Sequence, residues 1–130
     1  MDVLIRLTAE HDATRALLEP VIAAAKARDP RALSASLEVA HTALTDGLDT
    51  HIEVEEEAFA AIAEKLGHEH LAQYYKDHVE IRALRDDVYR QLTQGTAPFE
   101  ASLRLCNLIL IHQQYEDHKL FPEAHESASQ

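Results

Sequence analysis

The chain has 130 residues, 46% of them hydrophobic, and its 12 basic and 23 acidic residues give a formal charge of −11. A chain of this length is enough for one domain and too short for two. The acidic balance argues against nucleic acid or an anionic membrane as a partner, because phosphates repel such a surface. The single cysteine, Cys106, excludes a disulfide framework, and we recognise no signal peptide or membrane span. We therefore expect one acidic, helical, cytoplasmic domain.

The first predicted helix covers about residues 3–28, where apolar residues recur at steps of three and four. Pro20 lies inside this range and predicts a bend or a division, because proline has no backbone N–H to donate. Asp29-Pro30 then marks a new helix start, an N-cap residue followed by a first-turn proline.

Three further apolar stripes predict three further helices. The second helix has its stripe over residues 33–66 and ends at Gly67, a C-terminal cap. The third stripe covers residues 71–92 and ends at Gly95. The fourth helix begins near Pro98, and its pattern ends where the chain reaches Phe121-Pro122.

Short connections decide how these helices are arranged. Loops of only a few residues force neighbouring helices to be antiparallel. We therefore predict an all-α fold, an up-down-up-down antiparallel four-helix bundle over residues 1–125, followed by a polar tail at residues 126–130.

Each apolar stripe is interrupted by one histidine, and two of these histidines have a glutamate four residues later. A step of four turns a helix by about 400°, so each His-x-x-x-Glu pair shares a face. Counted along alternating helices, these side chains converge on one layer, spread over roughly 10 Å of the bundle axis at ~1.5 Å per residue. The residues of the layer are His11, His51, Glu55, His78, His112 and Glu116.

Two carboxylates in such a layer require positive charge, because burying each without a cation costs several kcal/mol. No lysine or arginine shares the layer, although Arg15 and Arg82 lie one turn away. A metal is the simplest alternative, since imidazole and carboxylate suit iron, zinc, manganese or cobalt. Four imidazoles and two carboxylates exceed what one tetrahedral zinc needs, whereas two metals bridged by both carboxylates use every group.

Other polar residues near the layer are interpreted as surface groups. Glu53, Glu56 and Glu57 are expected to form a solvated face beside Glu55, and an extra metal ligand from among these three carboxylates is the alternative. His118 and His125 are expected to face solvent. Cys106 is interpreted as a small, buried apolar side chain.

The layer residues occur in the order His, His-x-x-x-Glu, His, His-x-x-x-Glu, with one part on each helix. This order resembles the hemerythrin-like, or HHE cation-binding, domains, and the likeness covers nearly the whole chain. Residues 77–82 and 112–122 look like the family's third and last helices, the latter with its Leu-Phe-Pro exit. The resemblance implies a non-haem di-iron centre, bridged by the two glutamates and by an oxo or hydroxo ligand, with zinc or manganese as substitutes.

The chain departs from the oxygen-carrying hemerythrins at two positions. Those carriers have His-x-x-x-His on the third helix, and the first of these positions is Tyr74 here. Their last acidic ligand lies five residues after its histidine, where this chain has Asp117, but Glu116 stays on the inward face and is preferred. Tyr74 and Asp117 are therefore candidate additional ligands. A lost imidazole leaves an iron that is more open or ligated by a phenolate, which favours redox chemistry or sensing over oxygen carriage.

Two functions of different classes follow from this interpretation. In the first, a di-iron protein binds or reacts with O2, peroxide or nitric oxide as a sensor, a scavenger or a peroxide-consuming protein. In the second, a metal-ordered binding module, holding iron or zinc, signals through a partner protein. We expect the first, because no effector region accompanies the domain in this sequence.

Overall fold

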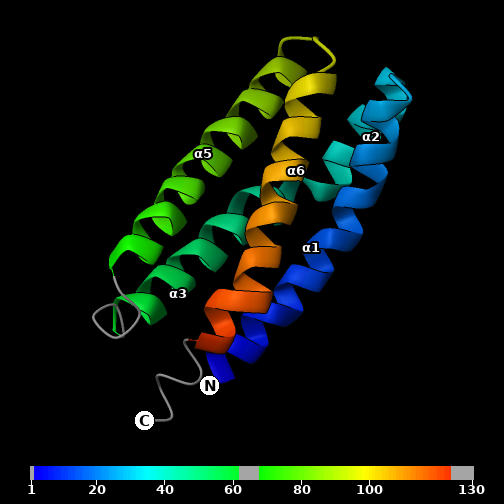
Figure 1. Cartoon of the computed structure of the whole chain (residues 1–130). Helices are drawn as coiled ribbons and strands as arrows, with labels where there is room; N and C mark the ends of the chain where they lie inside the picture. The colour runs from blue at the N-terminus through cyan, green and yellow to red at the C-terminus, as the bar shows by residue number, and fades with distance from the viewer. Residues whose placement is uncertain (1, 62–67, 124–130) are drawn as a thin grey trace.

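The structure is a computed structural model that describes residues 2–61 and 68–123, with the backbone alone described at residue 2 and at residues 68–70. Its regular elements are α1 (Asp2–Lys26), α2 (Pro30–Thr42), the π-helical turn η1 (Ala43–Gly47), α3 (Leu48–Ala60), α5 (His68–Thr93), α6 (Phe99–Tyr115) and the π-helical turn η2 (Glu116–Leu120). They form four passes along the bundle, which are α1, then α2 with η1 and α3, then α5, and then α6 with η2 (Figure 1). The predicted four-helix bundle is confirmed.

The passes pack around a common interior. α1 contacts α2, α3 and α6, and α6 also contacts α5. The beginning of α1 and the end of η2 lie at the same end of the bundle (Figure 1), as an even number of antiparallel passes requires. None of the described helices is long and apolar enough to cross a membrane.

α1 is one uninterrupted helix, so the division expected at Pro20 is wrong. Pro20 is exposed, which leaves the carbonyl of the preceding turn open to water. The helix ends at Lys26 rather than near Arg28, because Arg28 adopts a left-handed backbone with φ of 52°. The predicted start at Asp29-Pro30 is confirmed, since the Asp29 side chain caps α2.

The second predicted helix is interrupted by η1, which the stripe alone did not indicate. Leu44, Leu48 and Ile52 are all buried, and two successive steps of four in a regular α-helix would turn the stripe about 80° away from the core. The wider π-helical turn takes in one extra residue and returns the three side chains to one face. Arg85 donates a hydrogen bond of 3.2 Å to the Leu44 carbonyl and so ties η1 to α5. The predicted end at Gly67 lies outside the described residues.

The last two passes end differently from each other. Gly95 follows α5 with φ of +80°, a conformation that glycine adopts without strain, and so ends the third pass as predicted. Phe121-Pro122 does not end the fourth pass, since residues 121–123 are still helical. Phe121 is buried and stacks on the rings of His11 and Phe59, and this packing fixes the last turn against the bundle. The predicted tail at residues 126–130 lies outside the described part of the chain.

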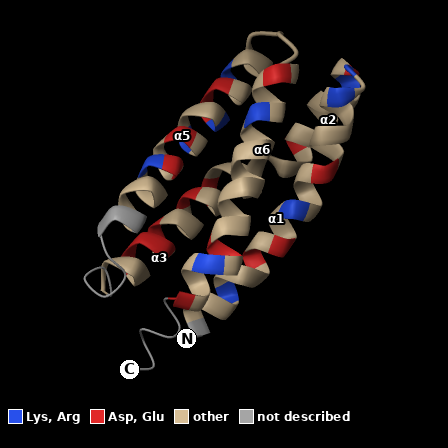
Figure 2. Cartoon of the chain, viewed as in Figure 1, with Lys and Arg blue, Asp and Glu red and all other residues tan. Residues whose placement is uncertain are grey.

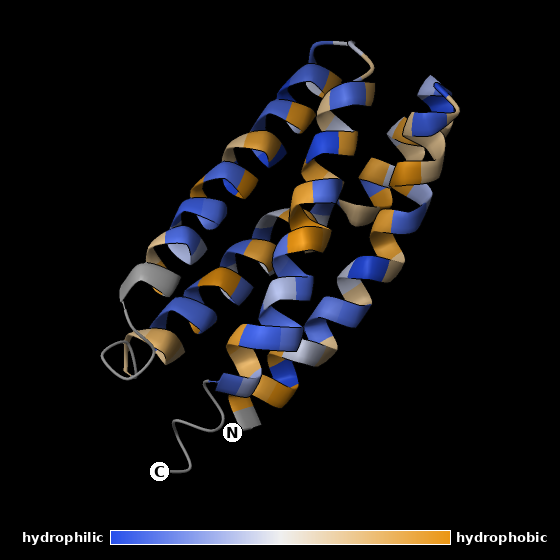
Figure 3. Cartoon of the chain, viewed as in Figure 1, coloured by the Kyte–Doolittle hydropathy of each residue, from blue (hydrophilic) through white to orange (hydrophobic). Residues whose placement is uncertain are grey.

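Hydrophobic residues recur along every helix (Figure 3), and the buried ones form two clusters. The larger cluster extends over α2, η1, the beginning of α3 and the adjoining parts of α1, α5 and α6, and it includes Cys106, which is buried as predicted. The smaller cluster lies where α1 begins and consists of Leu4, Leu7, Phe59, Leu71, Tyr74, Leu120 and Phe121. The predicted polar layer lies between the two clusters.

Candidate metal centre

Six polar side chains from all four passes meet between the two apolar clusters. Five of them are buried, and the His51 side chain is 12% exposed. We call this set the inner residues: His11 of α1, His51 and Glu55 of α3, His78 of α5, His112 of α6 and Glu116 at the start of η2. The structure therefore brings together all six side chains that the sequence assigned to one layer.

Glu55 lies at the centre of the inner residues, with its two oxygens facing different partners. Oε1 lies 2.6 Å from His51 Nε2 and 3.3 Å from His11 Nε2. Oε2 lies 3.3 Å from His78 Nε2 and accepts a hydrogen bond of 2.9 Å from Tyr74. Potential ligand atoms within 4.8 Å of one another form two sets, which are His11, His51 and Glu55 in one, and Glu55, His78, His112 and Glu116 in the other. Glu55 belongs to both sets.

Glu116 is a second carboxylate that reaches both sets. Its Oε1 lies 3.4 Å from His11 Nε2 and 3.3 Å from His112 Nε2. Its Oε2 is buried and has no hydrogen-bond partner among the described residues, and the same is true of His78 Nε2 and His112 Nε2. Buried polar atoms without partners are rare and costly. A cation between these three atoms would satisfy all of them, so the residues fit a metal.

Each inner histidine also has its second ring nitrogen against a carboxylate of a neighbouring helix. The distances from Nδ1 are 2.8 Å for His11 to Asp117, 2.8 Å for His51 to Glu10, 3.5 Å for His78 to Glu56 and 3.0 Å for His112 to Asp77. We call Glu10, Glu56, Asp77 and Asp117 the outer carboxylates. Their contacts lead from α1 to α3, from α3 to α5, from α5 to α6 and from η2 back to α1, and so close a ring around the bundle.

The outer carboxylates determine which nitrogen of each imidazole holds the proton. An ionised carboxylate only accepts hydrogen bonds, so Nδ1 donates to it and Nε2 presents a lone pair to the interior. The Nε2 atoms of His11 and His51 lie 3.0 Å apart. Two lone pairs at this distance repel each other unless a proton or a metal ion lies between them. Metal-binding histidines use this arrangement, with one nitrogen on the metal and the other on a carboxylate.

The acidity of the inner residues reflects the same need for positive charge. Burial alone would raise the pKa of Glu55, but the surrounding imidazoles of His11, His51 and His78 outweigh burial and hold this pKa well below its usual range. Burial raises the pKa of Glu116, and the charge of Glu55 raises it further, to well above its usual range. The two carboxylates therefore resist being ionised together unless a cation is shared between them.

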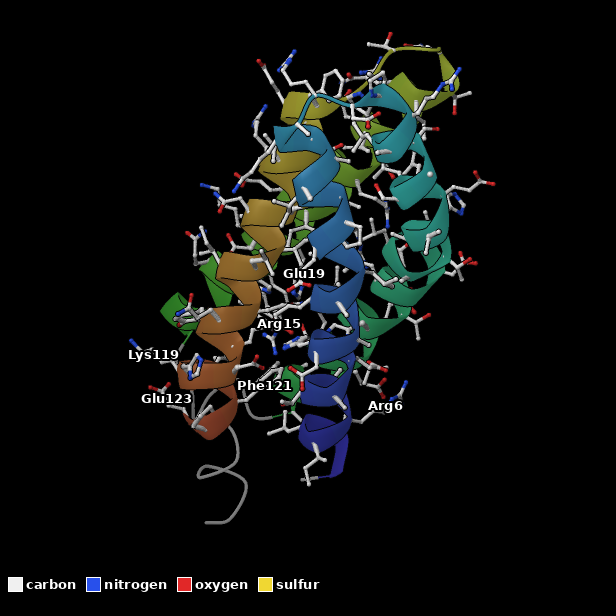
Figure 4. The ribbon with its side chains drawn as sticks, turned by 90° about the vertical axis from the view of Figure 1, so that its right-hand side faces the viewer. Arg6, Arg15, Glu19, Lys119, Phe121 and Glu123 are labelled. Atoms are coloured by element: carbon white, nitrogen blue, oxygen red, sulfur yellow. The ribbon has the colours of Figure 1, made fainter. Side chains whose placement is uncertain are left out.

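The two candidate additional ligands both contact the inner residues. The Tyr74 hydroxyl donates a hydrogen bond to Glu55. Asp117 faces the outer nitrogen of His11 and accepts a hydrogen bond of 3.1 Å from Arg15, which projects from α1 toward α6 (Figure 4). The assignment of Tyr74 and Asp117 as metal ligands stays a hypothesis, and the hydrogen bonds described for them here are made to protein groups.

Three of the outer carboxylates were missed by the sequence analysis. Glu56 was placed on a solvated face with Glu53 and Glu57, which is wrong for Glu56 because it faces His78, whereas Glu53 and Glu57 are exposed. Glu10 and Asp77 were not assigned a role. Every outer carboxylate is next to an inner residue in the sequence, and this adjacency narrows the candidates without deciding them, since Asp12 is also next to His11 and is exposed. Neighbouring residues point about 100° apart on a helix, so one faces the interior and the other the next helix.

Comparison with known proteins decides the family. The family model of the hemerythrin HHE cation-binding domain matches residues 2–124. The chain belongs to the hemerythrin HHE cation-binding domain family. No curated protein and no solved structure matches it significantly.

Family membership makes this HHE domain a cation-binding domain, and its inner residues are the histidine and glutamate clusters that are able to hold a cation. The charge distribution agrees with this, because α3 carries acidic residues and no lysine or arginine (Figure 2). His118 is exposed, as expected for a histidine outside the site, and His125 lies outside the described residues.

Proposed function

We propose that the protein is a non-haem di-iron protein that binds two ions, one at each set of inner residues. The observation that supports this best is the division of the Glu55 oxygens between the two sets. A carboxylate placed in this way is suited to bridge two cations. His11 and His51 would bind one ion, and His78 and His112 the other, with Glu116 as the second bridge.

The donor set supports iron, with zinc or manganese as substitutes. Imidazole and carboxylate ligands suit these metals, and the inner residues contain no thiolate. When bound, a pair of iron ions supplies redox chemistry and coordination positions for O2, peroxide or nitric oxide. Two bridging carboxylates and two imidazoles leave each ion short of six ligands, so a small exchangeable ligand has a place to bind.

The chain itself orients the ligands and limits what reaches them. The outer carboxylates hold the four imidazoles by Nδ1 and make them more basic. The cavity between the inner residues measures about 20 Å³, close to the smallest volume that holds one water. A space of this size favours ligands as small as O2, peroxide or nitric oxide over larger organic molecules.

Metal content of purified variants tests the ligand assignment. Glu55→Ala should lose more than half of the bound metal, because Glu55 serves both sets, whereas His112→Ala should lose about half. Glu57→Ala is the matched control, an exposed glutamate two residues along the same helix, and should lose none. Two ions retained by Glu55→Ala would contradict the bridging role.

Reactivity tests the function separately from the ligand assignment. The iron-loaded protein should consume hydrogen peroxide, and the zinc-loaded protein should not, because zinc has no redox chemistry. An iron-loaded protein that reacts with none of O2, peroxide and nitric oxide would favour the metal-ordered binding module instead.

A further inference from the structure

A surface pocket of about 190 Å³ lies directly beside the cavity of the inner residues. Its outer wall contains the small side chains of Ala13 and Ala43 and also Gly47. Leu48, His51 and Gln113 line this pocket and also line the metal cavity. A residue that lines both spaces lies between them. We call this space the entry pocket.

Gln113 differs from the other residues at this boundary in its hydrogen bonding. Its side chain is 5% exposed, and its Oε1 has no donor within the described parts of the chain. Thr14 donates to the Glu10 carbonyl and the Glu10 carboxylate faces His51, and both side chains are partly exposed to water. The Gln113 oxygen is the buried side-chain acceptor of the entry pocket that has no donor among the described residues, so a donor that enters the pocket satisfies it.

We propose that the entry pocket is the route by which a small hydrogen-bond donor of the hydrogen peroxide class reaches the metal cavity, where Gln113 accepts its hydrogen bond. This inference rests on the proposed function, because the ions are the destination of the ligand. Dioxygen and nitric oxide carry no O–H or N–H group and gain nothing from this acceptor. Gln113 thus favours peroxide over the two gases.

A pair of glutamine variants tests the role of Gln113. Gln113→Met keeps the side-chain length and removes the acceptor, and Gln114→Met changes the exposed neighbour as a matched control. In the iron-loaded protein, Gln113→Met should raise the KM for hydrogen peroxide about two- to tenfold, the loss expected for one hydrogen bond. The affinity for azide, which carries no proton at neutral pH, should stay within twofold. Gln114→Met should change neither.

Equal effects of Gln113→Met on peroxide and azide, or no effect on either, would overturn the role of Gln113. Metal content is measured on every variant, so that the two proposals fail in different ways. A protein that binds no metal contradicts the proposed function. A protein that binds metal and azide normally, with an unchanged KM for peroxide in Gln113→Met, contradicts only this inference.

Blocking the entry pocket tests the route by a binding rate alone. The chain contains no tryptophan, so the indole of Ala13→Trp is a unique fluorophore, and a blue-shifted emission shows that it fills the pocket. The rate of azide association, followed by absorbance after rapid mixing, should fall at least tenfold. Ala35→Trp, at an exposed position of α2, is the control and should leave the rate unchanged.

Ala43→Trp blocks the entry pocket from a second wall. The rate of azide association is compared with the wild type for whichever of the two variants, Ala13→Trp or Ala43→Trp, shows the blue-shifted emission of a buried indole. A buried indole with a normal rate of azide association would overturn the entry route.

Discussion

The Tyr74 hydroxyl donates a hydrogen bond of 2.9 Å to Glu55 Oε2, and both side chains are buried. Burial raises the pKa of Tyr74, and the negative charge of Glu55 raises it further, so in the metal-free protein the phenol keeps its proton at neutral pH. Tyr74 therefore acts through Glu55, by holding the oxygen that faces His78.

We expect Tyr74→Phe to retain its metal and to show the same visible spectrum as the wild-type iron-loaded protein. The metal-free protein should lose about 1 kcal/mol of unfolding free energy, because a buried acceptor loses its donor. Tyr75→Phe, at the half-buried neighbour, controls for the loss of a hydroxyl. A visible band that is present in the wild type and absent from Tyr74→Phe would instead identify a phenolate ligand.

Removal of metal should destabilise the whole bundle. A metal that binds only the folded state adds RT ln(1 + [L]/Kd), roughly 4 kcal/mol at a 1,000-fold excess over Kd. Because all four passes supply inner residues, a chelator should lower the midpoint of a single melting transition followed by circular dichroism. An identical melting curve with and without chelator would count against any internal metal site.

An outer carboxylate should control metal affinity without touching the metal. Asp77 accepts hydrogen bonds from His112 Nδ1 and from Gln73. We expect Asp77→Asn to weaken metal binding about 10- to 100-fold, since a neutral amide makes the imidazole less basic. Competition with a coloured chelator measures the affinity, and Glu80→Gln, at an exposed position of the same helix, should match the wild type. Wild-type affinity in Asp77→Asn would refute this role.

Arg85 should stabilise the connection between α2 and α3. Its side chain is buried, and Nη1 donates to the Leu44 carbonyl and, at 2.8 Å, to Asp49. Arg85→Met leaves the carbonyl without this donor, which should cost about 1–3 kcal/mol in urea-induced unfolding. Arg90→Met, at an exposed arginine of α5, should change stability by less than about 0.5 kcal/mol. Equal effects of the two substitutions would show that the contact with η1 contributes nothing.

Cys106 should be unreactive in the folded protein. The thiol is 1% exposed, and burial raises its pKa to about 12. The thiolate is the reactive form of cysteine. Because the pKa is raised, almost no Cys106 thiolate is present in the folded protein at pH 8. A coloured disulfide reagent should therefore modify Cys106 rapidly in urea and slowly without it. Rapid modification of the folded protein would show that the larger apolar cluster opens readily.

The inner residues were predictable because they break a strong pattern. Each apolar stripe repeats at helical spacing, and a histidine or glutamate inside it, such as His78 or Glu55, has no simple explanation as a surface residue. Helix lengths then fix the height of each residue along the bundle. Both the break in the apolar stripe and the number of residues along each helix can be read from the sequence, so the polar layer could be predicted without a structure.

The outer carboxylates and the π-helical turns depend on contacts between helices. Glu10 and Asp77 lie on flanks where acidic residues are common, and only the packing of the next helix shows which of them meets a histidine. Likewise, the spacing of Leu44 and Leu48 is compatible with an ordinary α-helix, and only the packed structure shows the wider turn between them. Their positions are properties of the assembled bundle.

The two π-helical turns divide their passes into segments whose rotation about the helix axis is set separately. η1 separates the apolar stripe of α2 from His51 and Glu55, and η2 begins at Glu116 itself. Losing one residue at η1 would rotate α3 by about 100° relative to α2. In evolutionary terms, a single insertion or deletion at η2 would rotate Leu120 and Phe121 of the smaller apolar cluster while the residues of α6 in the larger cluster keep their packing. The same change at η1 would also move Leu48 and Ile52 of the larger cluster, so the two turns differ in how freely they tolerate a change of length.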